Sequence, residues 1–250
     1  MLRFSTGLVQ SLAKDKSLKE VMHDGVLRVY SGNQPSSADD AKDGTLLLEV
    51  TLAGAGFTPG VKSTRQIDKD VIGSNTQDQT FILTINGTDI YTYVAGAAES
   101  TTTIATALAA LVDESDVVTA VSDGADVIVR ARFAGVAYSI AKSGTGTHTL
   151  SNLVANNRIA GLQFGSALAG VLSKESGVWS GLVLESGNAG WWRLYGNAVD
   201  PGTSSSTTLP RIDGSCSTVS GEMLMSSINL VKDITITVDQ FNVTIPKVRT

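Results

Sequence analysis

Two short segments far apart in the chain share one pattern. Residues 25–32 read GVLRVYSG and residues 190–197 read GWWRLYGN. Each has a glycine, two large apolar residues, an arginine, an apolar residue and a tyrosine before a turn. Successive side chains of a β-strand point to opposite faces. The pattern therefore predicts two strands, each with its arginine and tyrosine on one face and apolar side chains on the other.

This alternation constrains the tryptophans, because Trp191 and Trp192 of one strand point to opposite faces and cannot form one flat platform. We expect one in the core and the other on an inter-subunit or inter-domain surface, since aromatic residues and arginine are enriched at interfaces. The alternatives are simple surface coverage and stacking on a sugar, with Trp179 as a second ring. The candidate interface consists of Arg28, Tyr30, Trp179, Trp191, Trp192, Arg193 and Tyr195.

Most of the chain outside its middle also reads as short strands separated by turns. Residues 45–54 are nearly all apolar, and residues 234–245 alternate apolar and polar with a change of register at Asp239–Gln240. Only 17% of residues are charged, and glycine is abundant. We expect a mainly β protein, an antiparallel sandwich or barrel. A short N-terminal helix is predicted over residues 5–23, ending at Gly25.

The middle of the chain has a different predicted order of secondary-structure elements. Residues 61–78 read as a polar connection, and residues 80–95 as a hairpin around Asn86-Gly87. A helix with an apolar stripe follows, capped by Thr101 or Thr102, and then strands over residues 117–124 and 126–135. This hairpin-helix-hairpin order predicts a small α+β domain, residues 70–160, inserted into a discontinuous β-domain of residues 1–62 and 163–250.

The residues that usually carry chemistry are sparse. His23 and His148 are the only histidines and Cys216 is the only cysteine, so we expect no metal site, no cofactor, no disulfide and no enzyme activity. The net charge of −5 argues against nucleic-acid binding. No apolar run is long enough for a membrane span, and the N-terminus lacks a signal-peptide pattern. The acidic clusters at 37–43 and 113–116 read as a solvated loop and a helix end.

Several segments resemble virion structural proteins of tailed bacteriophages. They are MLRFSTGL, the stretch from DGVLRVYSG to GFTPG, the stretch from GVLSKESG to NAVDPG, RIDGSCSTVSGEMLMSS and ITITVDQFNVTIP. In that family the segment ending FTPG usually runs almost directly into the one containing GVLSK. Here about a hundred residues separate them, which also supports an insertion. The middle region itself resembles a small module that recurs in phage tail and capsid proteins.

The resemblance implies a non-enzymatic structural protein of the virion, assembled in the bacterial host cytoplasm, with no catalytic residues to carry over. The implied partners are copies of itself and other virion proteins, either the major capsid protein or tail proteins. We favour a capsid decoration or cement protein over a tail tube, neck, collar or other tail protein.

A third reading is a surface module that binds host glycans. This interpretation predicts exposed coplanar aromatic rings. Tyr91 and Tyr93 are two positions apart on one predicted strand and so share one face. Ordinary cross-strand packing of these tyrosines is the competing interpretation.

Overall fold

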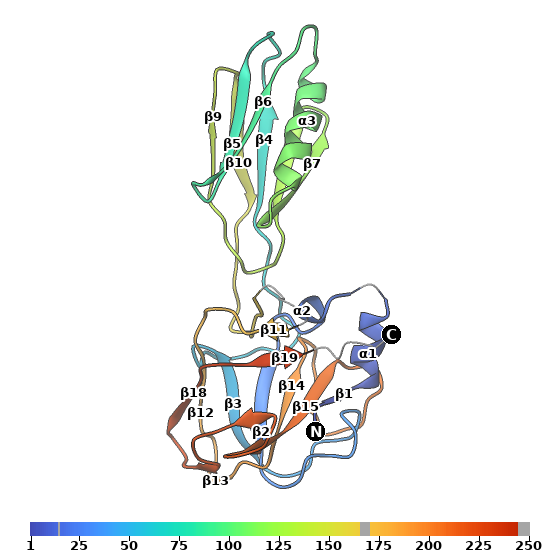
Figure 1. Cartoon of the computed structure of the whole chain (residues 1–250), viewed down its shortest axis with the longest axis vertical. Coiled ribbons are helices and arrows are strands. Elements are labelled where there is room, and N and C mark those ends of the chain that lie inside the picture. The colour runs from blue at the N-terminus through green and yellow to red at the C-terminus, as the bar shows by residue number, and fades with distance from the viewer. Residues whose placement is uncertain (15, 166–170, 245–250) are drawn as a thin grey trace. The chain divides into compact units, whose positions relative to one another are not determined.

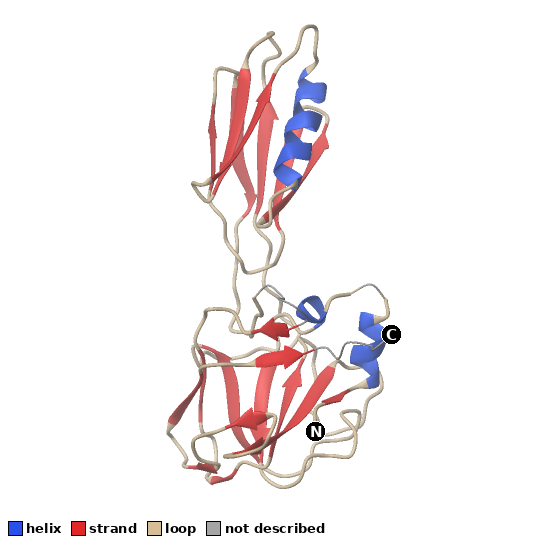
Figure 2. Cartoon of the chain, in the orientation of Figure 1, coloured by secondary structure: helices blue, strands red, loops and turns tan. Residues whose placement is uncertain are grey.

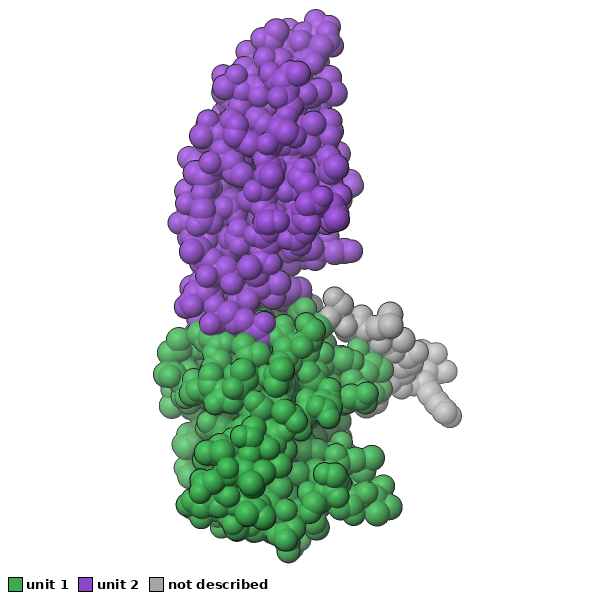
Figure 3. All heavy atoms as spheres, turned by 90° about the vertical axis from the view of Figure 1, so that its left-hand side faces the viewer, with its two compact units in different colours: residues 1–61, 159–250 green, residues 62–158 purple. Residues whose placement is uncertain are grey.

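The computed structural model describes residues 1–14, 16–165 and 171–244. The chain divides into two compact units, which Figure 3 colours separately: unit 1 comprises residues 1–61 and 159–250, and unit 2 comprises residues 62–158. Strands account for 39% of the chain and helices for 10%, and the sheets are antiparallel apart from one short parallel pair (Figure 2). The prediction of a mainly β protein with few helices is confirmed.

Unit 1 is built around one large sheet (Figure 1). Its hydrogen-bonded order is β1-β15-β14-β2-β3-β12-β18, and β16 pairs with β15 in parallel. The two predicted strands are adjacent, since Val26–Tyr30 pairs with Trp191–Tyr195 and places Arg28 opposite Arg193. The bounds are β1 Arg3–Phe4, β2 Val26–Tyr30, β3 Leu46–Leu52, β12 Trp179–Leu182, β14 Trp191–Tyr195, β15 Arg211–Ser217, β16 Met223–Leu224 and β18 Thr235–Val238.

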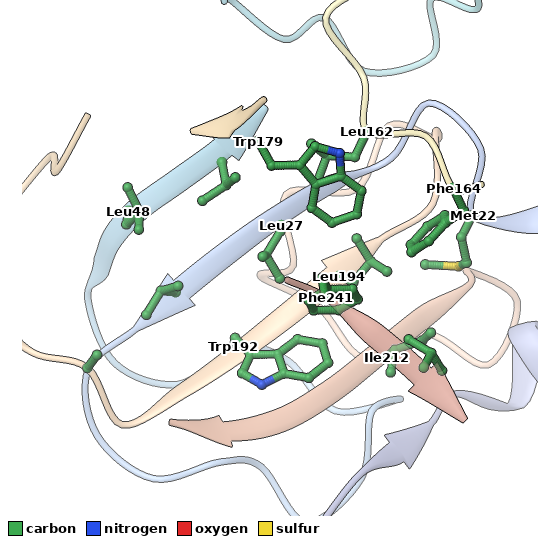
Figure 4. Close-up of a cluster of buried hydrophobic side chains, with 14 of the residues drawn as sticks. Met22, Leu27, Leu48, Leu162, Phe164, Trp179, Trp192, Leu194, Ile212 and Phe241 are labelled. Atoms are coloured by element: carbon green, nitrogen blue, oxygen red, sulfur yellow. The ribbon is translucent and has the colours of Figure 1, made fainter. Parts of the chain in front are cut away.

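One face of this sheet carries the main hydrophobic core of unit 1 (Figure 4). Trp192 lies in this core, where its ring meets Phe241 edge-on at 5.2 Å between centroids. Trp179 packs against the same phenylalanine and against Phe164. Two two-stranded sheets complete the unit: β11 Val171–Ser173 with β19 Asn242–Thr244, and β13 Gly187–Asn188 with β17 Asn229–Leu230. The part of the predicted last strand at residue 245 lies outside the described residues.

The predicted N-terminal helix is two short helices, α1 Thr6–Leu12 and α2 Leu18–Val21. Of the two candidate caps Ser5 and Thr6, Ser5 caps the first helix. Ser17 caps the second helix, because its hydroxyl accepts from the backbone N–H of Glu20. Gly25 is not the helix stop. The positive φ of 58° falls on Asp24, and Gly25 is needed because a Cβ there would overlap the backbone carbonyl of Tyr195.

Unit 2 contains two sheets that share one core with helix α3 (Figures 1 and 2). One sheet has the order β10-β4-β8-β7 and the other β6-β5-β9. Helix α3 packs mainly against β7 and β8 and also contacts β6. The bounds are β4 Ile67–Ile72, β5 Thr80–Ile85, β6 Asp89–Val94, α3 Thr101–Asp113, β7 Val118–Asp123, β8 Asp126–Ala131, β9 Ile140–Ser143 and β10 His148–Val154.

The hairpin of unit 2 is confirmed, with positive φ at both Asn86 and Gly87. The helix is confirmed too, but its N-cap is Ser100 rather than Thr101 or Thr102. The reading of residues 61–78 as a connection is wrong, because β4 occupies residues 67–72 in the middle of the four-stranded sheet. Strand β10 also lay outside the hairpin-helix-hairpin prediction. Both strands carry polar inward-facing residues, which hid them from a search for apolar alternation.

The two ends of unit 2 lie side by side, and so do the two chain segments of unit 1 at Leu52 and Ala160. In unit 1 the backbone N–H of Leu52 donates to the carbonyl of Ala160 at 2.8 Å. In unit 2 Thr64 and Asn157 form an antiparallel bridge, with an N–H to carbonyl distance of 2.8 Å. Unit 2 is therefore a contiguous stretch of sequence that begins and ends at neighbouring positions.

Candidate functional site

The face of the large sheet opposite the main core carries a row of charged side chains. Strand pairing places Glu49, Arg28, Arg193, Asp213 and Arg3 opposite one another in turn, across β3, β2, β14, β15 and β1. We call these five residues the charged row. A charged row across five strands is costly to bury unless each charge is paired and hydrogen-bonded.

The centre of the charged row is the pair Arg193–Asp213. The guanidinium donates from Nε to Oδ1 at 2.6 Å and from Nη2 to Oδ2 at 2.7 Å, and both side chains are fully buried. Burial alone would lower the pKa of Arg193, but its hydrogen bonds to Asp213 and the charge of that carboxylate outweigh burial and raise the pKa. The arginine is therefore permanently charged, and its partner is fixed by a two-point contact.

A second buried pair lies beside the charged row. Arg211 of β15 donates to both carboxylate oxygens of Asp200, at 2.6 and 2.8 Å. Its remaining N–H groups donate to the backbone carbonyls of Asp39, Asp40 and Ser204, at 3.1–3.3 Å. Arg193 also donates to the backbone carbonyl of Asp40, at 3.0 Å. The two arginines thus bind the loops 31–45 and 196–210 to the sheet.

Aromatic rings fill the space on the same face. Tyr30 stacks on Trp191 at 4.6 Å between ring centroids, and its hydroxyl lies 2.8 Å from that of Tyr195. Burial and the neighbouring Tyr195 raise the pKa of Tyr30 well above its usual value, so it stays neutral. The guanidinium of Arg28 lies 4.9 Å from the centre of the Tyr195 ring, and that of Arg193 lies 5.2 Å from Trp191.

These observations correct the candidate interface. Six of its seven side chains are at most 1% exposed, and only Arg28 reaches solvent, in part. The prediction that each Arg and Tyr shares one face is right, as is the prediction that Trp191 and Trp192 point apart. None of these six side chains forms an exposed surface for a partner, because Tyr30, Trp191, Arg193 and Tyr195 lie beneath the two loops of this chain and Trp179 and Trp192 lie in the main core. A buried ring cannot stack on a sugar either, which removes the tryptophans from the glycan reading.

Sequence reasoning missed Arg211, Asp213 and Asp200, which complete the network. A signal for two of them was present, because RIDG at residues 211–214 alternates arginine and aspartate on one strand face. The acidic loop 37–43 is also not simply solvated. The carboxylate of Asp39 accepts from the N–H of Thr6 at 2.8 Å and from its hydroxyl at 2.6 Å.

Unit 2 has its own buried polar cluster. On β4 the carboxylates of Asp68 and Asp70 both face inward. Nδ1 of His148 lies 2.6 Å from Asp70 Oδ2, and its Nε2 lies 3.0 Å from the carbonyl oxygen of Ser143, which can only accept. The imidazole therefore bridges the side chain of Asp70 and the backbone of Ser143, and Gln66 and Asn152 donate to Asp68 at 2.8 Å. The cluster holds β10 and the segment before it to β4.

Tyr91 and Tyr93 do share one face of β6, as predicted, but that face is turned to the core of unit 2 and both rings are half-buried. The hydroxyl of Tyr93 donates to Glu99 at 2.8 Å. The cross-strand packing interpretation therefore fits these rings better than a sugar platform does.

Cys216 lies on β15 and packs at the margin of the main core of unit 1. Burial raises the pKa of its thiol to about 12. We therefore expect alkylation by iodoacetamide at pH 8 to be at least about a hundredfold slower than that of a free cysteine, because the thiolate is the reactive form. The rate, followed by mass spectrometry, should rise steadily as the pH is raised above 9. Rapid labelling at pH 8 would show an accessible thiol instead.

Within residues 1–14, 16–165 and 171–244, no cluster of three or more histidine, cysteine, aspartate or glutamate side chains is arranged to hold a metal ion. Among the same residues, no helix has the length and apolar character needed to cross a membrane.

Comparison with protein-family models and with curated proteins found no match for the chain.

Proposed function

We propose that this protein is a non-enzymatic structural component of a tailed-bacteriophage virion. The observation that carries the proposal is the two buried ion pairs Arg193–Asp213 and Arg211–Asp200. Arg211 fixes the loop 196–210 by a two-point contact to Asp200, and both arginines donate to backbone carbonyls of the loop 31–45. A subunit of a repetitive particle needs such a rigid framework, because its contacts must repeat identically. The resemblance of the unit 1 segments to virion structural proteins is the reason for proposing that this particle is a tailed-bacteriophage virion.

We further propose that unit 1 is a β-sandwich virion domain and that unit 2 is an α+β domain inserted into it. The division of the chain at residues 61/62 and 158/159 supports this organisation. It starts the inserted domain eight residues earlier than the sequence predicted, because β4 belongs to it.

The partners in this proposal are copies of the chain and other virion proteins. We favour a decoration or cement protein bound to the major capsid protein, with a tail tube, neck or collar subunit as the alternative. The half-burial of Tyr91 and Tyr93 and the burial of all three tryptophans leave the glycan-binding reading without aromatic rings that support it.

Two measurements test the proposal in sequence. Mass spectrometry of purified particles should detect the chain at a copy number that matches a symmetric component. Fab fragments raised against unit 2 should then label intact particles in negative-stain micrographs. Label spread over the head supports decoration of the capsid, and label confined to the tail or neck overturns that location. Absence of the chain from particles overturns the virion role altogether.

A further inference from the structure

One outer face of unit 2 has no charged side chain. In the three-stranded sheet, alternate residues of β5 and β6 point away from the core. They are all uncharged and all β-branched, and Ile90 and Val94 are 64% and 52% exposed. The small residues Ala141 and Ser143 of β9 continue the face, because they pair with β5. We call this surface the uncharged face; its main residues are Thr80, Ile82, Thr84, Ile90, Thr92 and Val94.

The helix beside β6 continues this character. The exposed side of α3 carries threonine and alanine, including Thr102, Thr106 and Ala110, and its one exposed charge is Asp113 at the last position. The outer face of the four-stranded sheet is different. There Lys69 pairs with Asp126 at 3.1 Å across β4 and β8, as expected of a surface in contact with water. The contrast shows that the lack of charge is particular to one side of unit 2.

We propose that the uncharged face is a self-association surface that packs against the same face of a second copy of this chain. Every copy carries a net charge of −5, so two copies repel least where neither presents a charge. A basic or acidic partner would be recognised by charges, which this face lacks. Two identical faces related by a twofold axis also bring β-branched rows against one another, which is how uncharged sheet faces pack.

The contact is expected to be weak. Short side chains of three strands and part of a helix bury less than the roughly 800 Å² per partner of a standard stable complex. We therefore expect a dissociation constant between about 10 μM and 1 mM for the purified chain. Copies held close together on a particle would experience a high effective concentration and so associate. The inference does not depend on the proposed virion role, because it concerns the chain in solution.

Sedimentation velocity of the full chain between about 10 μM and 1 mM tests the proposal. The weight-average sedimentation coefficient should rise with concentration from that of a 26.0 kDa monomer towards that of a dimer. Thr84→Lys and Thr92→Lys should each weaken association at least about tenfold, because a twofold contact doubles each new charge. Thr149→Lys, on the exposed outer side of β10, is the matched control and should change nothing. Higher salt should strengthen association, since it screens the repulsion between copies.

Crosslinking gives a second readout that does not depend on disrupting the contact. In Thr92→Cys, a short bis-maleimide should link two chains much faster than in Thr149→Cys, while the native Cys216 reacts slowly. A chain that stays monomeric at about 1 mM would overturn the proposal. Equal effects of the β6 and β10 variants, or association that weakens with salt, would also overturn it. Failure to find the chain in virions would leave these results unaffected, so the two proposals fail separately.

Discussion

Replacing Asp213 by alanine is expected to destabilise unit 1 by about 3–5 kcal/mol, because the substitution leaves the buried guanidinium of Arg193 without its carboxylate. Arg193→Met should cost a similar amount for the converse reason. The double variant Arg193→Met/Asp213→Leu should lose much less than the sum, since it removes both charges and fills the space with apolar atoms. A large favourable coupling is thus expected for this pair.

Tryptophan fluorescence during urea unfolding measures this effect in unit 1 alone, because Trp179, Trp191 and Trp192 are the only tryptophans and all lie there. The control is Glu185→Ala, which breaks an exposed ion pair with Lys232 and should change the free energy of unfolding by less than about 1 kcal/mol. If Asp213→Ala cost no more than this control, the buried pair Arg193–Asp213 would not be a major contribution to the stability of unit 1.

Truncation of either adjacent tryptophan is the second large expected effect. Trp192→Ala removes a ring from the main core, and Trp191→Ala removes the ring that stacks on Tyr30, so each should cost about 3–5 kcal/mol. The result separates burial from an interface role. A tryptophan that covered a surface for a partner would change the stability of the free chain by only about 0.5 kcal/mol when truncated.

The same urea unfolding experiment, with the remaining two tryptophans as reporters, provides the measurement. Val199→Ala, at a side chain that is 75% exposed, is the control and should be neutral. A neutral Trp191→Ala variant alongside a destabilised Trp192→Ala variant would restore the original prediction of one core and one surface tryptophan.

Local patterns predicted those elements whose side chains alternate simply. The strands around Arg28 and Arg193 were predicted from the alternation of apolar and polar residues. The hairpin was predicted from Asn86-Gly87, because these two residue types favour the positive φ angles that a two-residue turn requires. Strand β4 escaped because its inward positions include Asp68 and Asp70. Their burial depends on His148 and Asn152, which are about eighty residues away and become partners only in the folded unit.

The candidate site shows the same limit. The alternation in the sequence predicted correctly that Trp191 and Trp192 point to opposite faces of the strand. It could not show what covers Trp191 and Arg193. The cover consists of the loops 31–45 and 196–210, and their contribution is largely made through backbone carbonyls such as those of Asp40 and Ser204. Carbonyl groups are present at every residue, so no residue pattern marks the ones that are used.

The adjacent ends of unit 2 bear on how this chain can change over evolutionary time. The entropy of closing a loop depends on bringing its two ends together and only slowly on its length. The bridge between Thr64 and Asn157 already joins the two ends of unit 2. For the folding of unit 1, the entropy of closing this connection is therefore similar to that of closing a short turn. We therefore expect the boundary to tolerate replacement of unit 2 by another segment whose ends lie equally close together, with the arginine pairs of unit 1 unchanged.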